Sequence, residues 1–176
     1  MPSDISIGHI LSCVLRGIKE FCMDWKVDIY IKTDTRYLGK RKRWISYVIA
    51  TTVKKELKTI EHFEAVEETL QGAQLIAIDA ALKRMTKPAK IVIHVESSFI
   101  ANMFTMHLAE WAAGGWINPM RNNKEWRYLE AQTHRHEITI DTEPHVYSAW
   151  QLLMMKKQAE MAQDRVNTES GGILDV

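Results

Sequence analysis

The sequence predicts an α/β protein built on a five-stranded mixed sheet with helices on both faces. Three observations predict this fold class. Three successive segments carry apolar residues at every second position and are joined by short links, which is typical of three antiparallel strands. Later strand-like segments alternate with segments whose apolar residues recur every three or four positions, as in parallel βα units. The chain has 176 residues, of which 46% are hydrophobic, and this is enough for one domain with a single core.

The first predicted element is an amphipathic N-terminal helix. Between Ile5 and Phe21, apolar side chains recur at intervals of three and four positions and form one stripe. We expect residues 1–24 to form a helix that packs on the following domain. This helix is an addition to the five-stranded fold.

Three strands are predicted next. Between Trp25 and Asp34, β-branched residues alternate with polar ones, and Trp44–Val53 and Lys58–Glu67 also resemble strands. A turn containing Gly39 joins the first two segments. We therefore expect three antiparallel strands in chain order.

The second half of the chain predicts helices that alternate with strands. Leu75, Ile78, Leu82 and Met85 are spaced as in a buried helix, which Pro88 ends. The later predicted elements are a buried strand at 90–97, a helix from Ser97 or Ser98 to Gly114, a helix at 122–131, a strand at 136–143 and a helix at 146–161. Residues 25–163 then form one domain, and residues 164–176 form a flexible tail.

Charge is distributed unevenly along a chain whose net charge is only +1. The window 36–58 holds eight basic residues and one acidic residue, a net charge of +7, so the remainder carries −6. This asymmetry predicts contact with nucleic acid through a basic hairpin, with aromatic side chains available for stacking. The predicted contact residues are Arg36, Lys40, Arg41, Lys42, Arg43, Trp44, Lys54 and Lys55. The alternative is an ordinary solvated turn.

The two cysteines predict no disulfide. Cys13 and Cys22 lie on opposite sides of the predicted N-terminal helix, about 13 Å apart along its axis. The sequence also has no basic stretch followed by an apolar signal segment and no apolar run long enough to span a bilayer. We therefore expect a cytoplasmic protein without a membrane partner.

Five motifs resemble those of the ribonuclease H-like superfamily, over roughly residues 25–160. They are Ile29–Asp34, which ends in Thr-Asp like the family's first strand; Thr69–Leu75, like the opening of its first helix; Val95–Ile100, like the end of its fourth strand; Asn122–Trp126, like its Asn-x-x-x-Trp helix; and Pro144–His145, where the family often has Gly-His. The resemblance implies a ribonuclease H-like fold for this part of the chain.

The resemblance also implies a site in which four carboxylates hold two Mg²⁺ ions. Asp34 matches the first carboxylate, Gln74 stands in place of the second, and Glu96 stands in place of the third. No acid occurs at Leu152–Met155, where the fourth is expected. Ending the first strand two residues earlier would instead place Lys32 at the first position, because residues 32 and 34 share a face. The carboxylate set is incomplete under either assignment, which argues against a two-metal site.

Less specific roles also fit the two candidate ligands. Asp34 could be the polar end of a strand that enters a turn, and Glu96 could cap the next helix. We favour a site role for Glu96, because strand ends in α/β sheets line crevices.

The resemblance implies a non-catalytic or weakly active protein that binds nucleic acid or acts as an accessory module. Its ligand would be RNA, DNA or a hybrid, or a protein partner, with no cofactor or a weakly bound Mg²⁺ or Mn²⁺. One alternative is an active nuclease in which Asp34 and Glu96 hold one ion, Gln74 is a neutral ligand, and Asp141 or Glu143 contributes from the last strand. A second alternative is a protein-binding scaffold.

Overall fold

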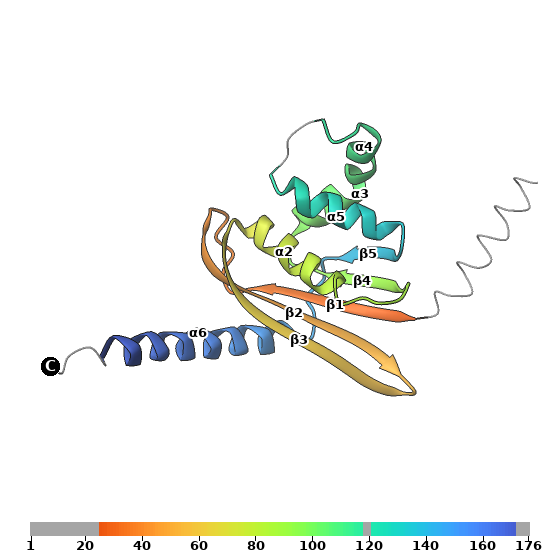
Figure 1. Cartoon of the computed structure of the whole chain (residues 1–176). Coiled ribbons are helices and arrows are strands. Elements are labelled where there is room, and N and C mark those ends of the chain that lie inside the picture. The colour runs from red at the N-terminus through yellow and green to blue at the C-terminus, as the bar shows by residue number, and fades with distance from the viewer. Residues whose placement is uncertain (1–24, 118–120, 172–176) are drawn as a thin grey trace, which may run out of the picture.

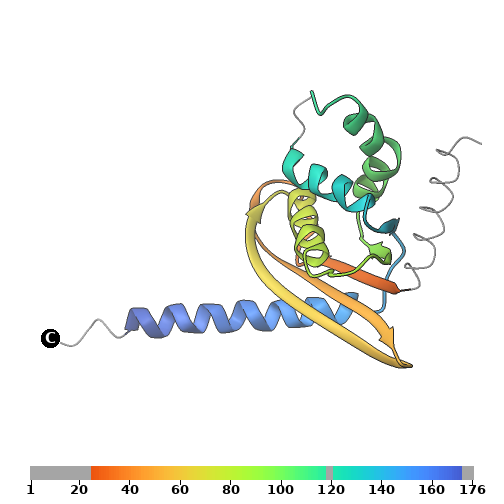
Figure 2. The same ribbon diagram turned by 45° about the vertical axis from the view of Figure 1, so that its right-hand side comes forward.

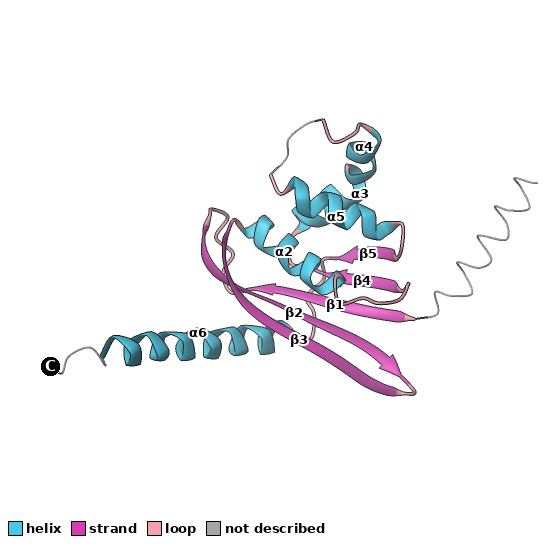
Figure 3. Cartoon of the chain, viewed as in Figure 1, coloured by secondary structure: helices cyan, strands magenta, loops and turns pink. Residues whose placement is uncertain are grey.

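A computed structural model describes residues 25–117 and 121–171. In chain order its elements are β1 (Lys26–Thr33), β2 (Arg41–Val53), β3 (Glu56–Glu68), α2 (Leu70–Leu82), β4 (Lys90–His94), α3 (Ser98–Met106), α4 (Leu108–Ala113), α5 (Asn123–Thr133), β5 (Glu137–Asp141) and α6 (Ser148–Gly171). Figure 3 shows these helices and strands along the chain. The predicted N-terminal helix at 1–24 lies outside the described residues.

The five strands form one mixed sheet in the order β3-β2-β1-β4-β5. The β1–β2 and β2–β3 pairs are antiparallel, whereas β1–β4 and β4–β5 are parallel. Three antiparallel strands followed by parallel βα units were predicted, and this prediction is confirmed. The parallel register pairs Tyr30 with His94, so the residues that follow β1 and β4 leave the sheet at the same edge.

The sheet separates two unequal layers of helices. Helices α2 and α5 lie on one side and α6 on the other (Figure 1). The buried core lies on the α2 side, where Val27, Ile29 and Ile31 of β1 face α2. Ala73, Ala77 and Ala81 are fully buried, and their small side chains let α2 lie close to the strands.

Three predicted helices differ in their bounds from the structure. Helix α2 ends at Leu82, before Met85, which was expected to lie on it. The helix expected from Ser97 or Ser98 to Gly114 is divided into α3 and α4 at His107, whose φ of −123° leaves the helical range. Helix α6 continues to Gly171, past Met161 and through the first part of the tail predicted at 164–176. Its distal half projects away from the sheet (Figure 2). The distal residues are mostly exposed, so no apolar stripe marked the helix in the sequence.

Among the helices of residues 25–117 and 121–171, none combines the length and the apolar character needed to cross a bilayer.

Candidate functional site

Lys32 and Glu96 form an ion pair at the edge where β1 and β4 end. Each lies two residues beyond the paired residues Tyr30 and His94, so both side chains point to the same side of the sheet. The Lys32 ammonium donates a hydrogen bond to Oε1 of Glu96. The Ser148 hydroxyl, at the start of α6, donates to the same oxygen at 3.2 Å. Three distant parts of the sequence therefore meet at one carboxylate.

The surroundings of Glu96 favour its charged form. Burial, the largest single effect, acts to raise the pKa of its carboxyl group, but the hydrogen bond and charge of Lys32 together with Ser148 and Arg36 outweigh burial and lower that pKa. Ser148 and the charge of Arg36, whose guanidinium is 4.0 Å from the carboxylate, act in the same direction. Glu96 is therefore a carboxylate at neutral pH, with its charge balanced inside the protein.

The structure brings two of the three predicted catalytic residues together. Gln74 and Glu96 line the same cavity of about 320 Å³, and Gln74 is only 3% exposed. The Oε1 atom of Gln74 has no hydrogen-bond partner in the described part of the chain. Asp34 is exposed and is absent from the cavity lining, while its backbone N–H donates to the carbonyl of Trp44. Of the two alternatives for the first position, Lys32 is the residue beside Glu96, whereas Asp34 lies outside the cavity lining.

His145 lies close enough to this ion pair for the charges of Glu96 and Lys32 to act on its imidazole. Its Nε2 is 3.4 Å from the carbonyl oxygen of Ile31, and its buried Nδ1 has no partner among the described residues. Burial lowers the pKa of this imidazole, against the opposing effects of the Ile31 carbonyl and of Glu96. A neutral imidazole therefore faces this edge of the sheet at pH 7.

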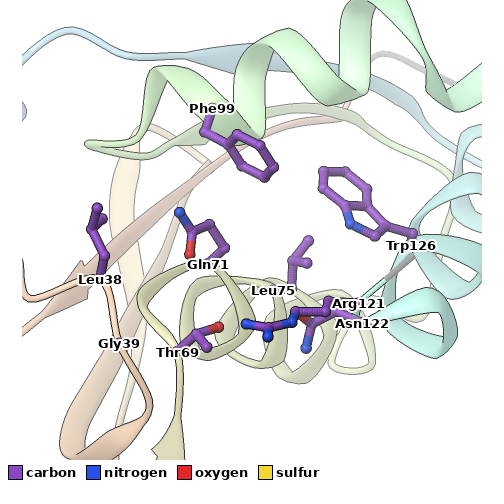
Figure 4. A pocket seen from close by; sticks show the side chains of 9 residues that line it. All are labelled: Leu38, Gly39, Thr69, Gln71, Leu75, Phe99, Arg121, Asn122 and Trp126. Atoms are coloured by element: carbon purple, nitrogen blue, oxygen red, sulfur yellow. The ribbon is translucent and has the colours of Figure 1, made fainter. Parts of the chain in front are cut away.

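A second cavity adjoins the first and extends it into a groove. It has a volume of about 430 Å³ and shares Leu38, Gln71 and Phe99 with the first cavity. Side chains from the β1–β2 loop, α2, α3 and α5 surround it, with Arg121 and Trp126 toward its far end (Figure 4). We call the two adjoining cavities the groove.

Gly72 allows the first turn of α2 to approach the segment that begins α5. A Cβ atom at Gly72 would lie 2.8 Å from Nδ2 of Asn122, closer than side chains normally pack. Asn122 and Trp126, which the sequence analysis matched to a family motif, both line the groove. The Asn122–Trp126 motif therefore contributes two side chains to the lining of the groove.

The predicted basic hairpin is divided between two distant places. Arg36, Lys40, Arg41 and Lys42 are exposed at the end of the hairpin near the groove. Strand β2 has 13 residues and a length of about 40 Å, and the turn with Lys54 and Lys55 lies at its other end. The two groups of cations in the predicted basic hairpin therefore lie at opposite ends of β2.

Arg43 is a structural residue. It is 1% exposed, and its guanidinium donates to the carbonyl oxygens of Glu68, Tyr37 and Gly39 at 3.0, 2.9 and 2.7 Å. These bonds connect the β1–β2 loop to the end of β3. Arg43 is therefore corrected from a nucleic-acid contact to a support of the loop, and Trp44 beside it is half-buried.

The site also includes residues that the sequence analysis did not select. Ser148 is 52 positions from its partner Glu96, and Arg121 directly precedes the Asn122–Trp126 motif without being part of it. No local spacing signal joins these positions. A contact of this kind depends on the fold.

Curated proteins named Ribonuclease H are similar in sequence to this chain. The match to the Janthinobacterium protein has 26% identity over 117 residues and covers 64% of this chain and 78% of that protein. The match to the Granulibacter bethesdensis protein has 30% identity over 99 residues and covers 54% and 63%. The match to the Bordetella avium protein has 29% identity over 76 residues and covers 41% of this chain and only 50% of that protein. No protein-family model matches the chain.

Solved structures share the fold. The N-terminal RNase H domain of a Mycobacterium tuberculosis protein matches 79% of this chain and 99% of its own, with a TM-score of 0.53 and 17% identity. A foamy viral protease-reverse transcriptase in complex with an RNA/DNA hybrid matches 88% of this chain and 20% of its own, with a TM-score of 0.53 and 17% identity. This chain therefore has a ribonuclease H-like fold.

The described residues of this ribonuclease H-like chain do not form the two-metal site that the resemblance implies. Among the described residues, no group of three or more His, Cys, Asp or Glu side chains could hold a metal ion. Magnesium prefers several anionic oxygen ligands, but Glu96 is paired with an ammonium and Gln74 is neutral. The residues at this edge of the sheet therefore do not fit a pair of divalent cations.

Proposed function

We propose that this ribonuclease H-like protein binds nucleic acid in the groove as a non-catalytic or weakly active module. The observation that carries the proposal is that the groove, with Arg36 and Arg121 among its lining residues, opens beside a carboxylate that an internal lysine neutralises. The curated relatives are named Ribonuclease H, and one protein of similar fold is described in complex with an RNA/DNA hybrid. An RNA/DNA hybrid is therefore the first ligand to test.

Charge and aromatic side chains near the groove support binding of a phosphate backbone. Arg36 and Arg41 are exposed, and the Arg41 guanidinium lies 5.6 Å from the ring centre of the exposed Tyr37. Phe99 is 41% exposed and lines both cavities. Cations provide attraction that is independent of base sequence, and aromatic rings can stack on bases.

The proposal predicts that removing the cations near the groove weakens binding. We expect the triple variant Arg36→Ala/Lys40→Ala/Arg41→Ala to bind a labelled RNA/DNA hybrid less tightly than the original protein. Its plot of log affinity against log salt concentration should be shallower, by about 0.9 for each phosphate that the variant no longer neutralises. Fluorescence anisotropy at several salt concentrations measures both effects.

The far end of the same hairpin provides a matched control. The triple variant Lys54→Ala/Lys55→Ala/Lys58→Ala also removes three positive charges, but about 40 Å away along β2. We expect it to retain the original affinity and salt dependence. Equal weakening by both variants would show that net charge, and not the groove, governs binding, and no binding by the original protein at low salt would refute the proposed function.

A further inference from the structure

The Lys32 ammonium is a counter-charge for the Glu96 carboxylate that the protein itself supplies. The side chain of Lys32 is 6% exposed, and its ammonium is bonded to a carboxylate whose own side chain is 20% exposed. A buried carboxylate needs a counter-charge or several hydrogen bonds. Here the protein supplies both, through Lys32 and Ser148.

The geometry also limits what else can approach Glu96. Oε1 already receives the Lys32 ammonium and the Ser148 hydroxyl, while Oε2 faces Arg36 at 4.0 Å. A divalent cation bound at this carboxylate would lie next to the buried Lys32 ammonium and near the exposed Arg36 guanidinium. Mutual repulsion would oppose its binding, and few anionic ligands are available to compensate.

We propose that the Lys32 ammonium replaces a divalent cation at this edge of the sheet, so that the groove accepts a phosphodiester of a bound strand without metal. This inference rests on the proposed function, because it specifies how the groove binds nucleic acid. Glu96 alone would repel a phosphate group that enters the cavity it lines. Lys32 cancels that charge, and Arg36 at the same cavity leaves a net positive charge near the phosphate.

Metal binding can be measured without nucleic acid. The electron paramagnetic resonance signal of free Mn²⁺ is measured while the protein is titrated with this ion. We expect the original protein and Glu96→Gln to bind Mn²⁺ equally weakly. Lys32→Asp, which places a second carboxylate beside Glu96, should bind Mn²⁺ at least about tenfold more tightly than the original protein. Tight Mn²⁺ binding by the original protein that Glu96→Gln abolishes would overturn the proposal. This comparison does not require Lys32→Asp to fold.

Binding of a fluorescein-labelled RNA/DNA hybrid tests the role of the lysine charge. At constant ionic strength, the original protein should bind equally well in EDTA and in Mg²⁺. Lys32→Gln should bind about tenfold more weakly in EDTA, because Glu96 then repels the strand. The double variant Lys32→Gln/Glu96→Gln removes both charges and should recover the original affinity, which a folding defect at position 32 would not allow.

The two hypotheses fail in different ways. An affinity of the original protein that rises tenfold in Mg²⁺ and loses this rise in Glu96→Gln would refute the metal-free mode but leave nucleic-acid binding intact. Absence of hybrid binding under every condition would refute the proposed function and, with it, the proposed role of Lys32 in phosphate binding.

Discussion

Asp79 is a buried acid in the last turn of α2 and is 7% exposed. Its Oδ1 atom has no hydrogen-bond partner among the described residues. Burial raises the pKa of this carboxyl group to about 7, although the nearby charge of Lys83 opposes the change. The neutral acid is therefore favoured in the folded protein, whereas the unfolded chain ionises near the ordinary value of 3.8.

The raised pKa of Asp79 determines the sign of a pH effect. Between about pH 4 and pH 7 the folded state holds a proton that the unfolded state releases, so the free energy of unfolding falls as the pH rises. We expect Asp79→Asn, which is uncharged at every pH, to equal the original protein at pH 4. At pH 8 the variant should be more stable by about 2–4 kcal/mol.

Urea denaturation at pH 4, 6 and 8 measures this difference. Asp164→Asn is a suitable control, because Asp164 is an exposed acid on the distal part of α6. The control should follow the original protein at all three pH values. If Asp79→Asn showed no relative gain between pH 4 and pH 8, the carboxyl group would not be desolvated in the folded state.

At the scale of elements, α6 has two parts with different roles. Near its start, Gln151 is fully buried and donates at 3.0 Å to both the Tyr30 carbonyl and the Ser46 hydroxyl. One turn later, Met155 is 1% exposed. Residues 160–168 are exposed, and the Gln163–Asn167 bond lies within the helix. The first part of α6 therefore attaches the helix to the sheet.

A truncated chain tests this division. We expect removal of residues 162–176 to change the melting temperature by no more than about 2 °C, because residues 162–168 are exposed. Gln151→Ala should cost about 1–3 kcal/mol, because it leaves buried groups of β1 and β2 without their donor. Thermal unfolding followed by circular dichroism compares the two. A drop of more than about 5 °C on truncation would show that the distal part contributes to the folded core.

At the scale of the whole molecule, the chain has the fold that the resemblance implies, but its described residues do not form the metal site that the resemblance also implies. The sheet order and the helix layers are those of ribonuclease H-like proteins, but the edge that the resemblance assigns to metal ions holds a lysine–glutamate pair. The fold alone therefore does not establish hydrolysis. An active metal-dependent nuclease remains the alternative to the proposed binding function.

Cleavage of an end-labelled RNA/DNA hybrid separates these two functions. We expect the purified protein in Mn²⁺ to cut no faster than in EDTA, because the described residues do not provide a set of carboxylates for a catalytic ion. Glu96→Gln should behave in the same way. Cleavage that requires Mn²⁺ and is abolished in Glu96→Gln would instead establish a nuclease with a reduced set of ligands.

The sequence by itself determined the order of the elements and the mixed sheet. Apolar periodicity depends on which side of a strand or helix is buried, so the first three strands were predicted closely. The motifs that resemble the family also placed Gln74 and Glu96 at one site. Boundaries without a buried stripe were predicted poorly, as the distal part of α6 shows.

Only the tertiary structure decided which side chains share the site. Lys32 and Asp34 have the same strand parity, so the pattern cannot choose between them, but the parallel register of β1 and β4 places Lys32 beside Glu96. Arg43 is adjacent to exposed cations in the sequence, yet backbone carbonyls surround it. Lys32 and Glu96 are 64 positions apart, and contacts over such separations depend on how the chain closes, which local periodicity does not record.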